Sequence, residues 1–175
     1  MKTLVWLMGK PGSGKSTVGK LLQEKIENCS HFSFGELLKE MQKTPAPEGY
    51  TLDDQQRVYD FIKDRVPGNN VLVIDCNPYP PKRSGEHEQL DYLFDEVVNI
   101  NLICSDEEGL SRLESRGREI LAHDGSKSED RLNNFNNVVL PEIEKSRALS
   151  NIIDISTERS SPEEIVDLIL TNIKN

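Results

Sequence analysis

The sequence predicts an α/β fold with three layers, in which a five-stranded parallel sheet carries helices on both faces. Five short apolar runs alternate along the 175 residues with segments of helical periodicity. The run Val71–Asp75 is almost continuously apolar and rich in β-branched residues, which is typical of a parallel strand covered on both sides. Such an alternation implies right-handed crossovers and places ligands beyond the carboxyl ends of the strands.

The amino-terminal half predicts three strands and three helices. The first strand is expected at 4–8, and a helix follows the next glycine-rich segment because apolar residues recur there on one face: Val18, Leu21, Leu22 and Ile26. Phe32 and Phe34 alternate as in a strand, and a helix is expected from Gly35 to Gln42. Thr51–Asp54 resembles a helix cap, so another helix begins there and ends before the third strand at 71–75.

The carboxyl-terminal half continues the alternation. A proline-rich loop at 77–85 leads into a helix that we expect to reach about Glu96, and the fourth strand spans 97–104. Ser105 and Ser161 each precede a glutamate by three residues, which is the capping-box spacing and predicts two helix starts. A polar stretch at 117–129 precedes a helix that ends near Arg147, and the last strand is expected at 151–155.

Gly9–Ser16 reads Gly-Lys-Pro-Gly-Ser-Gly-Lys-Ser and fits the phosphate-loop pattern G-x-x-x-x-G-K-S/T. The glycines of this motif let backbone N–H groups converge on phosphate oxygens, the lysine reaches the outer phosphates, and the hydroxyl can bind Mg²⁺. The alternative, a glycine-rich turn with a solvated lysine, is disfavoured by the strand before the motif and the helix after it. We therefore expect a nucleotide's phosphates to contact Gly9, Pro11, Gly12, Ser13, Gly14, Lys15, Ser16 and Thr17.

Length, charge and cysteine content restrict the class of protein. A chain of 175 residues without a long linker is expected to form a single domain over 1–175. Its net charge of −9 argues against a nucleic-acid-binding surface. The three cysteines form no C-x-x-C pair, and no segment approaches the length of a membrane span. These observations favour a soluble, cytoplasmic and most simply monomeric protein that contacts neither nucleic acid nor membrane.

Asp75 is the candidate carboxylate for magnesium, because it ends an apolar strand next to the phosphate loop. An ordinary strand-end turn residue is the alternative. The following residue is Cys76 rather than a water-activating glutamate, and no N-K-x-D guanine-binding motif occurs. Both absences favour transfer of a phosphoryl group to another molecule over a motor ATPase or a GTPase. His31, His87 and His123 have no metal-ligand spacing, and His31 is interpreted as a strand-edge residue.

Phosphoryl transfer needs cations around the migrating group, so arginines are the next candidates. Arg112 and Arg116 are four residues apart and share a helix face, Arg118 follows at once, and Arg131 lies beyond the polar stretch. On composition alone each of these arginines is more simply a solvated surface charge.

The chain resembles the adenylate kinase family of nucleoside monophosphate kinases, in the right order along most of its length. The segments that carry the resemblance, besides the phosphate loop, are His31–Lys39 (similar to S-T-G-D-x-L-R), Val73–Pro78 (L-D-G-F/Y-P-R), Arg112–Arg118 (R-L-x-x-R), Ser128–Leu132 and 151–174. The resemblance implies a phosphate-loop fold that binds ATP·Mg²⁺, an acceptor-binding segment at about 35–66 and a short lid at about 117–129.

By the same resemblance, Lys15, Arg116, Arg118 and Arg131 would surround the transferred phosphoryl group as catalytic residues. Arg112 would contact the nucleotide, and Ser16 and Asp75 would hold the magnesium ion. The acceptor, a nucleoside monophosphate, would contact Phe34, Glu36, Lys39, Arg83 and Gln89.

The acceptor side departs from the family pattern, so three functions stay open. Lys39 replaces an arginine and loses its bidentate fork, and Tyr79 stands where a second acceptor arginine is expected. A nucleoside monophosphate offers an oxyanion that needs no base, whereas an alcohol needs a carboxylate such as Glu36. The alternatives are therefore a metabolite kinase that uses Glu36 as base, with helix capping as the simpler role of this residue, and a nucleotide-binding module with little turnover.

Overall fold

The computed structural model describes residues 1–41, 52–76, 88–115, 128–148 and 150–173. Five parallel strands form one sheet in the order β2-β3-β1-β4-β5. Their bounds are Thr3–Gly9 (β1), Cys29–Ser33 (β2), Val71–Asp75 (β3), Glu96–Ile103 (β4) and Ile152–Ser156 (β5). The predicted five-stranded α/β fold is confirmed.

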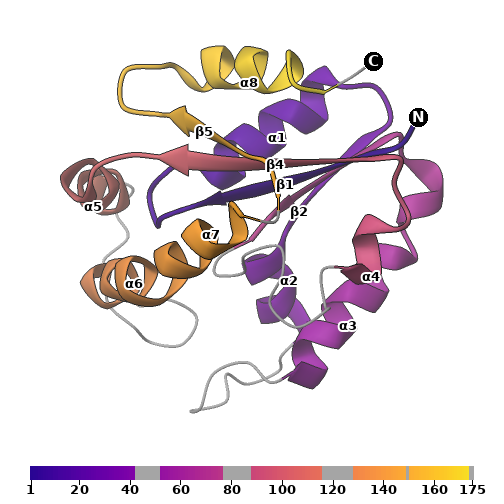
Figure 1. The fold of residues 1–175 in the computed structure, drawn as a ribbon, viewed down its shortest axis with the longest axis horizontal. Helices are drawn as coiled ribbons and strands as arrows, with labels where there is room; N and C mark the ends of the chain where they lie inside the picture. Colours follow the sequence, from indigo (N-terminus) through magenta and orange to yellow (C-terminus); the bar gives the residue numbers. More distant parts are fainter. Residues whose placement is uncertain (42–51, 77–87, 116–127, 149, 174–175) are drawn as a thin grey trace.

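Helices cover both faces of the sheet (Figure 1). α1 (Lys15–Lys25) and α8 (Pro162–Leu170) pack on one face. The other face is covered by α2 (Phe34–Met41), α3 (Leu52–Lys63), α4 (Glu88–Asp91), α7 (Leu140–Ser146) and the π-helical turn that precedes α7. α5 (Asp106–Ser115) and α6 (Ser128–Asn134) lie at the carboxyl end of the sheet (Figure 1).

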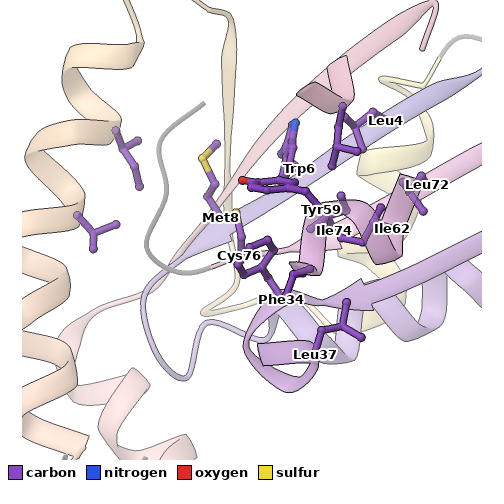
Figure 2. Packing of buried hydrophobic residues seen from close by; sticks show 14 of the residues in the cluster. Leu4, Trp6, Met8, Phe34, Leu37, Tyr59, Ile62, Leu72, Ile74 and Cys76 are labelled. Carbon is purple, nitrogen blue, oxygen red and sulfur yellow. The ribbon is translucent and has the colours of Figure 1, made fainter. Parts of the chain in front are cut away.

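Strand alternation divides the core into two clusters, one on each face. Leu4, Trp6 and Met8 of β1 point to the α3 side, and Val5 and Leu7 point to the α1 side. Both faces are apolar because both are covered, as expected for a parallel sheet. Figure 2 shows the larger cluster, whose aromatic side chains pack between the sheet and helices α2 and α3.

Two predicted boundaries were wrong. Phe34 does not continue the second strand; it is the first residue of α2, and its ring packs 5.3 Å from that of Tyr59 in α3 (Figure 2). The helix expected up to about Glu96 ends at Asp91, and Glu96 opens β4 instead. At Phe34, burial of the aromatic ring in the core outweighs the local alternation.

The helix expected to end near Arg147 contains an irregularity. Between α6 and α7, residues Phe135–Val139 form a π-helical turn, called here the π segment. The capping box at Ser161 is confirmed: its hydroxyl accepts from the Glu164 N–H, and the Glu164 carboxylate accepts from the Ser161 N–H. No helix in the described ranges combines the length and the hydropathy that a bilayer crossing requires.

Candidate active site

The phosphate loop joins the end of β1 to the start of α1, and three of its glycines have left-handed φ angles: +144° at Gly9, +82° at Gly12 and +94° at Gly14. A side chain at these positions would be strained. A Cβ on Gly12 would also lie 2.2 Å from the carbonyl oxygen of Gly109, whereas one on Gly14 would meet nothing within 4 Å. The loop is therefore pressed against α5 on one side and open on the other.

The loop has the features of an anion site. Gly14 is the N-cap of α1 and contributes no side-chain cap, and the first turn of α1 contains no acidic residue. Ser13 is 1% exposed, and its Oγ has no hydrogen-bond partner within the described part of the chain. Unpaired N–H groups at a helix start attract negative charge. The open space at Gly14 and these donors fit a bound phosphate group.

Lys15 places its ammonium over the loop. Its Nζ donates to the carbonyl oxygens of Gly9 at 2.7 Å and Lys10 at 3.0 Å. Burial lowers the pKa of Lys15 to about 8; the carboxylate of Asp75 opposes this shift, and the positive charge of Arg131 adds to it. The ammonium thus lies near one carboxylate and one guanidinium, in a place where a phosphate would stabilise its charged form.

Asp75 ends β3 beside the loop, since Leu7 of β1 is its neighbour in the sheet. Its side chain is 7% exposed, and Oδ2 lies 2.9 Å from His31 Nε2. Burial raises the pKa of Asp75, but hydrogen bonds from His31 and Ser16 and the charge of Lys15 outweigh burial and lower it. The Asp75 carboxylate is hydrogen-bonded to the hydroxyl of Ser16. These two oxygen groups fit Mg²⁺, which takes few protein ligands and keeps several waters.

His31 is a site residue that the sequence interpretation missed. It lies on the edge strand β2, yet its side chain is only 4% exposed and packs on α1, where a Cβ on Gly19 would be 2.3 Å from its Nε2. Gly19 therefore leaves the space that the ring occupies. The available signal was strand alternation: His31 shares a face with Ser33, which is the neighbour of Asp75 in the sheet.

Of the predicted arginines, the structure brings Arg131 to the loop. Arg131 lies in α6, is half-buried and acts on the pKa of Lys15. Arg112 lies in α5, where Nε donates to Glu108 and the two Nη groups donate to the hydroxyl and the carbonyl oxygen of Thr157. Arg116 and Arg118 lie outside the described residues.

The acceptor residues are only partly described. Phe34 is 3% exposed and belongs to the core cluster on the α3 side. Glu36 is exposed in the first turn of α2. Lys39 lies in α2 and Gln89 in α4, but their side chains are outside the described part, as is all of Arg83. The roles of these five residues stay predictions.

Comparison with known proteins supports the interpretation of residues 9–16 as a phosphate loop. A family model described as an AAA domain matches residues 5–134. An adenylate kinase of Nitratiruptor sp. is 32% identical over 148 residues, which cover 78% of this chain and 74% of that enzyme. An adenylate kinase of Francisella tularensis subsp. novicida is 29% identical over 108 residues, which cover 55% of this chain and 49% of that enzyme.

Solved structures share the fold at lower sequence identity. A shikimate kinase of Acinetobacter baumannii in complex with shikimate superposes with a TM-score of 0.65, 18% identity, and coverage of 100% of this chain and 97% of that one. A gluconokinase of Sinorhizobium meliloti gives a TM-score of 0.63, 21% identity, and coverage of 97% and 90%. At such identities the likeness shows the fold alone.

Proposed function

Because the chain belongs to the adenylate kinase family of P-loop kinases, we propose that it transfers the γ-phosphoryl group of ATP to a nucleoside monophosphate. That it is a kinase-like phosphotransferase follows from the family. The nucleotide donor, the magnesium ion and the acceptor are the proposal. The observation that carries it is the position of the Lys15 ammonium over the phosphate loop, close enough to Asp75 and Arg131 for both to act on its pKa.

The residues have separable roles in this proposal. Backbone N–H groups of the loop and the start of α1 bind the phosphates, and Lys15 compensates the charge of the outer ones. Ser16 and Asp75 would hold Mg²⁺, which neutralises charge on the phosphate oxygens when it is bound. Arg131 approaches from α6 and would stabilise the negative charge that spreads over the transferred group.

A nucleoside monophosphate is favoured as acceptor because the sequence relatives are adenylate kinases and because its phosphate oxyanion needs no general base. Reduced cysteines fit a cytoplasmic enzyme, and Cys76 and Cys104 are buried and form no disulfide. A cytoplasmic location and a monomeric state are part of the proposal.

One observation favours a second acceptor class. Glu36 is exposed at the start of α2, near the carboxyl end of the sheet, and a carboxylate there could take a proton from a hydroxyl acceptor. The gluconokinase and shikimate kinase structures share the fold. Helix-start charge compensation is a sufficient role for Glu36 in the favoured proposal.

Acceptor-dependent ADP release, measured over a panel of nucleoside monophosphates and small alcohols, distinguishes these functions. The proposal predicts turnover with a nucleoside monophosphate and a rate in Glu36→Gln within about threefold of the unmodified enzyme. Glu40→Gln is the matched control, because Glu40 is exposed one turn further along α2. Turnover only with an alcohol, lost in Glu36→Gln alone, would establish the metabolite kinase. Silence across the panel with micromolar ATP binding would establish a binding module.

A further inference from the structure

Asp106, the first residue of α5, connects two parts of the molecule that the proposed reaction must hold together. Its Oδ1 accepts a charged hydrogen bond from Lys10 Nζ in the phosphate loop. Its Oδ2 accepts from Asn136 Nδ2 in the π segment at 2.8 Å. The hydrogen bonds from Lys10 and Asn136 lower the pKa of Asp106, so the carboxylate is charged at neutral pH.

The loop and α5 are also in backbone contact at this point. A Cβ on Gly109 would lie 2.9 Å from the Pro11 carbonyl oxygen, and one on Gly12 would lie 2.2 Å from the Gly109 carbonyl oxygen. Only two glycines facing one another permit this approach. The first turn of α5 is therefore a fixed support for the loop, and Asp106 lies at its start.

Asn136 lies where the helix from α6 to α7 is wound as a π-helix. Phe135 and Val139, at the two ends of the π segment, are both 3% exposed and anchored in the core. A π turn adds a residue to the helix and changes the direction of every side chain before it relative to those after it. Arg131 is in α6, which ends immediately before the π segment, so the contact from Asn136 to Asp106 joins the end of the helix that carries Arg131 to the start of α5.

We propose that Asp106 is a positioning residue, which fixes α6 and its Arg131 relative to the phosphate loop by bonding Lys10 and Asn136 with its two oxygens. The catalytic meaning of this link rests on the proposed function, because Arg131 matters only if phosphoryl groups are transferred. The link itself exists without nucleotide and is testable without turnover.

The first test is amide hydrogen exchange of the nucleotide-free protein. Asp106→Ala is expected to speed exchange of α6 and the π segment at least about tenfold, because a contact that holds a local structure sets its opening free energy. Glu107→Ala is the matched control: it removes an exposed acid from the same helix turn. Equal exchange of 128–139 in the two variants would overturn the proposal, whatever the enzyme's activity.

The second test is rescue by exchanging two side chains. Asn136→Asp places two carboxylates together and is expected to lower kcat about tenfold with the KM for ATP within about threefold. Adding Asp106→Asn gives position 106 an amide, whose NH₂ group can donate to the new carboxylate at position 136 and whose oxygen can accept from Lys10. The double variant should therefore recover most of kcat. A double variant as slow as Asn136→Asp would refute the link. Because Asn136→Asp keeps Asp106, this test also applies if Asp106→Ala does not fold.

Discussion

His31 Nε2 lies 2.9 Å from Asp75 Oδ2, and both side chains are almost completely buried, at 4% and 7% exposure. Removing the ring leaves a buried carboxylate with one partner fewer. We expect His31→Leu to lower the free energy of unfolding by about 2–4 kcal/mol in urea titrations. His31→Gln keeps an N–H donor at a similar reach and should lose less than half of that. Equal stability of His31→Leu and the unmodified protein would show that the hydrogen bond is dispensable.

Gly19→Ala tests the same pair from the opposite side. A Cβ there would lie 2.3 Å from His31 Nε2, so the ring must move away from Asp75. Alanine favours the helix by about 1 kcal/mol, yet we expect a net loss of about 1–3 kcal/mol in thermal or urea unfolding. Gly68→Ala is the control, because a Cβ at Gly68 meets nothing within 4 Å. Stabilisation by Gly19→Ala would mean that the ring is not tightly held.

Two loop glycines should differ in their tolerance of alanine. Gly12 and Gly14 both have left-handed φ angles, so each alanine substitution costs roughly 1 kcal/mol of backbone strain. Only at Gly12 does the new Cβ also collide with backbone, the carbonyl oxygen of Gly109. Urea unfolding without nucleotide should therefore show Gly12→Ala at least about 1–2 kcal/mol less stable than Gly14→Ala. The reverse order would contradict the contact between the loop and α5.

Lys15 should take up protons when ATP binds. Its pKa is lowered to about 8 in the free protein, so about half of the molecules lack this charge at pH 8. Bound phosphates favour the ammonium and raise its pKa. Calorimetry in buffers of different ionisation enthalpy should detect an uptake of about 0.5 proton per ATP at pH 8 and little at pH 6.5. Lys15→Arg, always charged, should show none. Proton release at pH 8 would contradict the proposed contact.

The lowered pKa of Lys15 also determines how the free energy of unfolding changes with pH. The unfolded chain holds the Lys15 proton up to pH 10.5, whereas the folded protein loses it near pH 8. Between these values the unfolded state binds more protons, so this group makes the free energy of unfolding rise with pH. Subtracting the pH profile of Lys15→Arg isolates that rise.

Arg131 is expected to act on transfer more than on binding. Arg131→Met should lower kcat about 10²- to 10³-fold, because a cation on the transferred group stabilises charge that develops in the transition state. The Kd for ATP should change less than about threefold. The pKa of Lys15 should rise toward its ordinary value, which reduces the proton uptake at pH 8. Lys145→Met, on the exposed part of α7, is the control. An unchanged kcat would show that Arg131 takes no part in phosphoryl transfer.

Local patterns were sufficient to predict the sheet, the phosphate loop and the Ser161 capping box. Each depends on residues adjacent in sequence: strand alternation, glycines at fixed spacing, or a serine three residues before a glutamate. The position of Asp75 beside the phosphate loop was also predictable, because topology fixes where an apolar parallel strand ends. Its role as a magnesium ligand stays a prediction.

Contacts between distant segments were not predictable in this way. The partners of His31 and Asp106 lie on other strands and helices. Strand alternation indicates which face of β2 carries His31, but not the register that places Asp75 of β3 beside it. The π segment consists of weak helix formers, Phe-Asn-Asn-Val-Val, and no local pattern in it predicts a π turn, although its first and last residues are buried in the core. Local alternation with Phe32 predicts Phe34 in a strand, but its ring packs on Tyr59, 25 residues further along the chain, and Phe34 begins α2 instead.

The most direct test of the central claim follows the labelled γ-phosphoryl group of ATP in the presence of Mg²⁺ and each nucleoside monophosphate. The account predicts that the label appears in a nucleoside diphosphate, and that Lys15→Ala abolishes this transfer while the protein stays folded by circular dichroism. Label found only in inorganic phosphate, or transfer by Lys15→Ala at the unmodified rate, would contradict it.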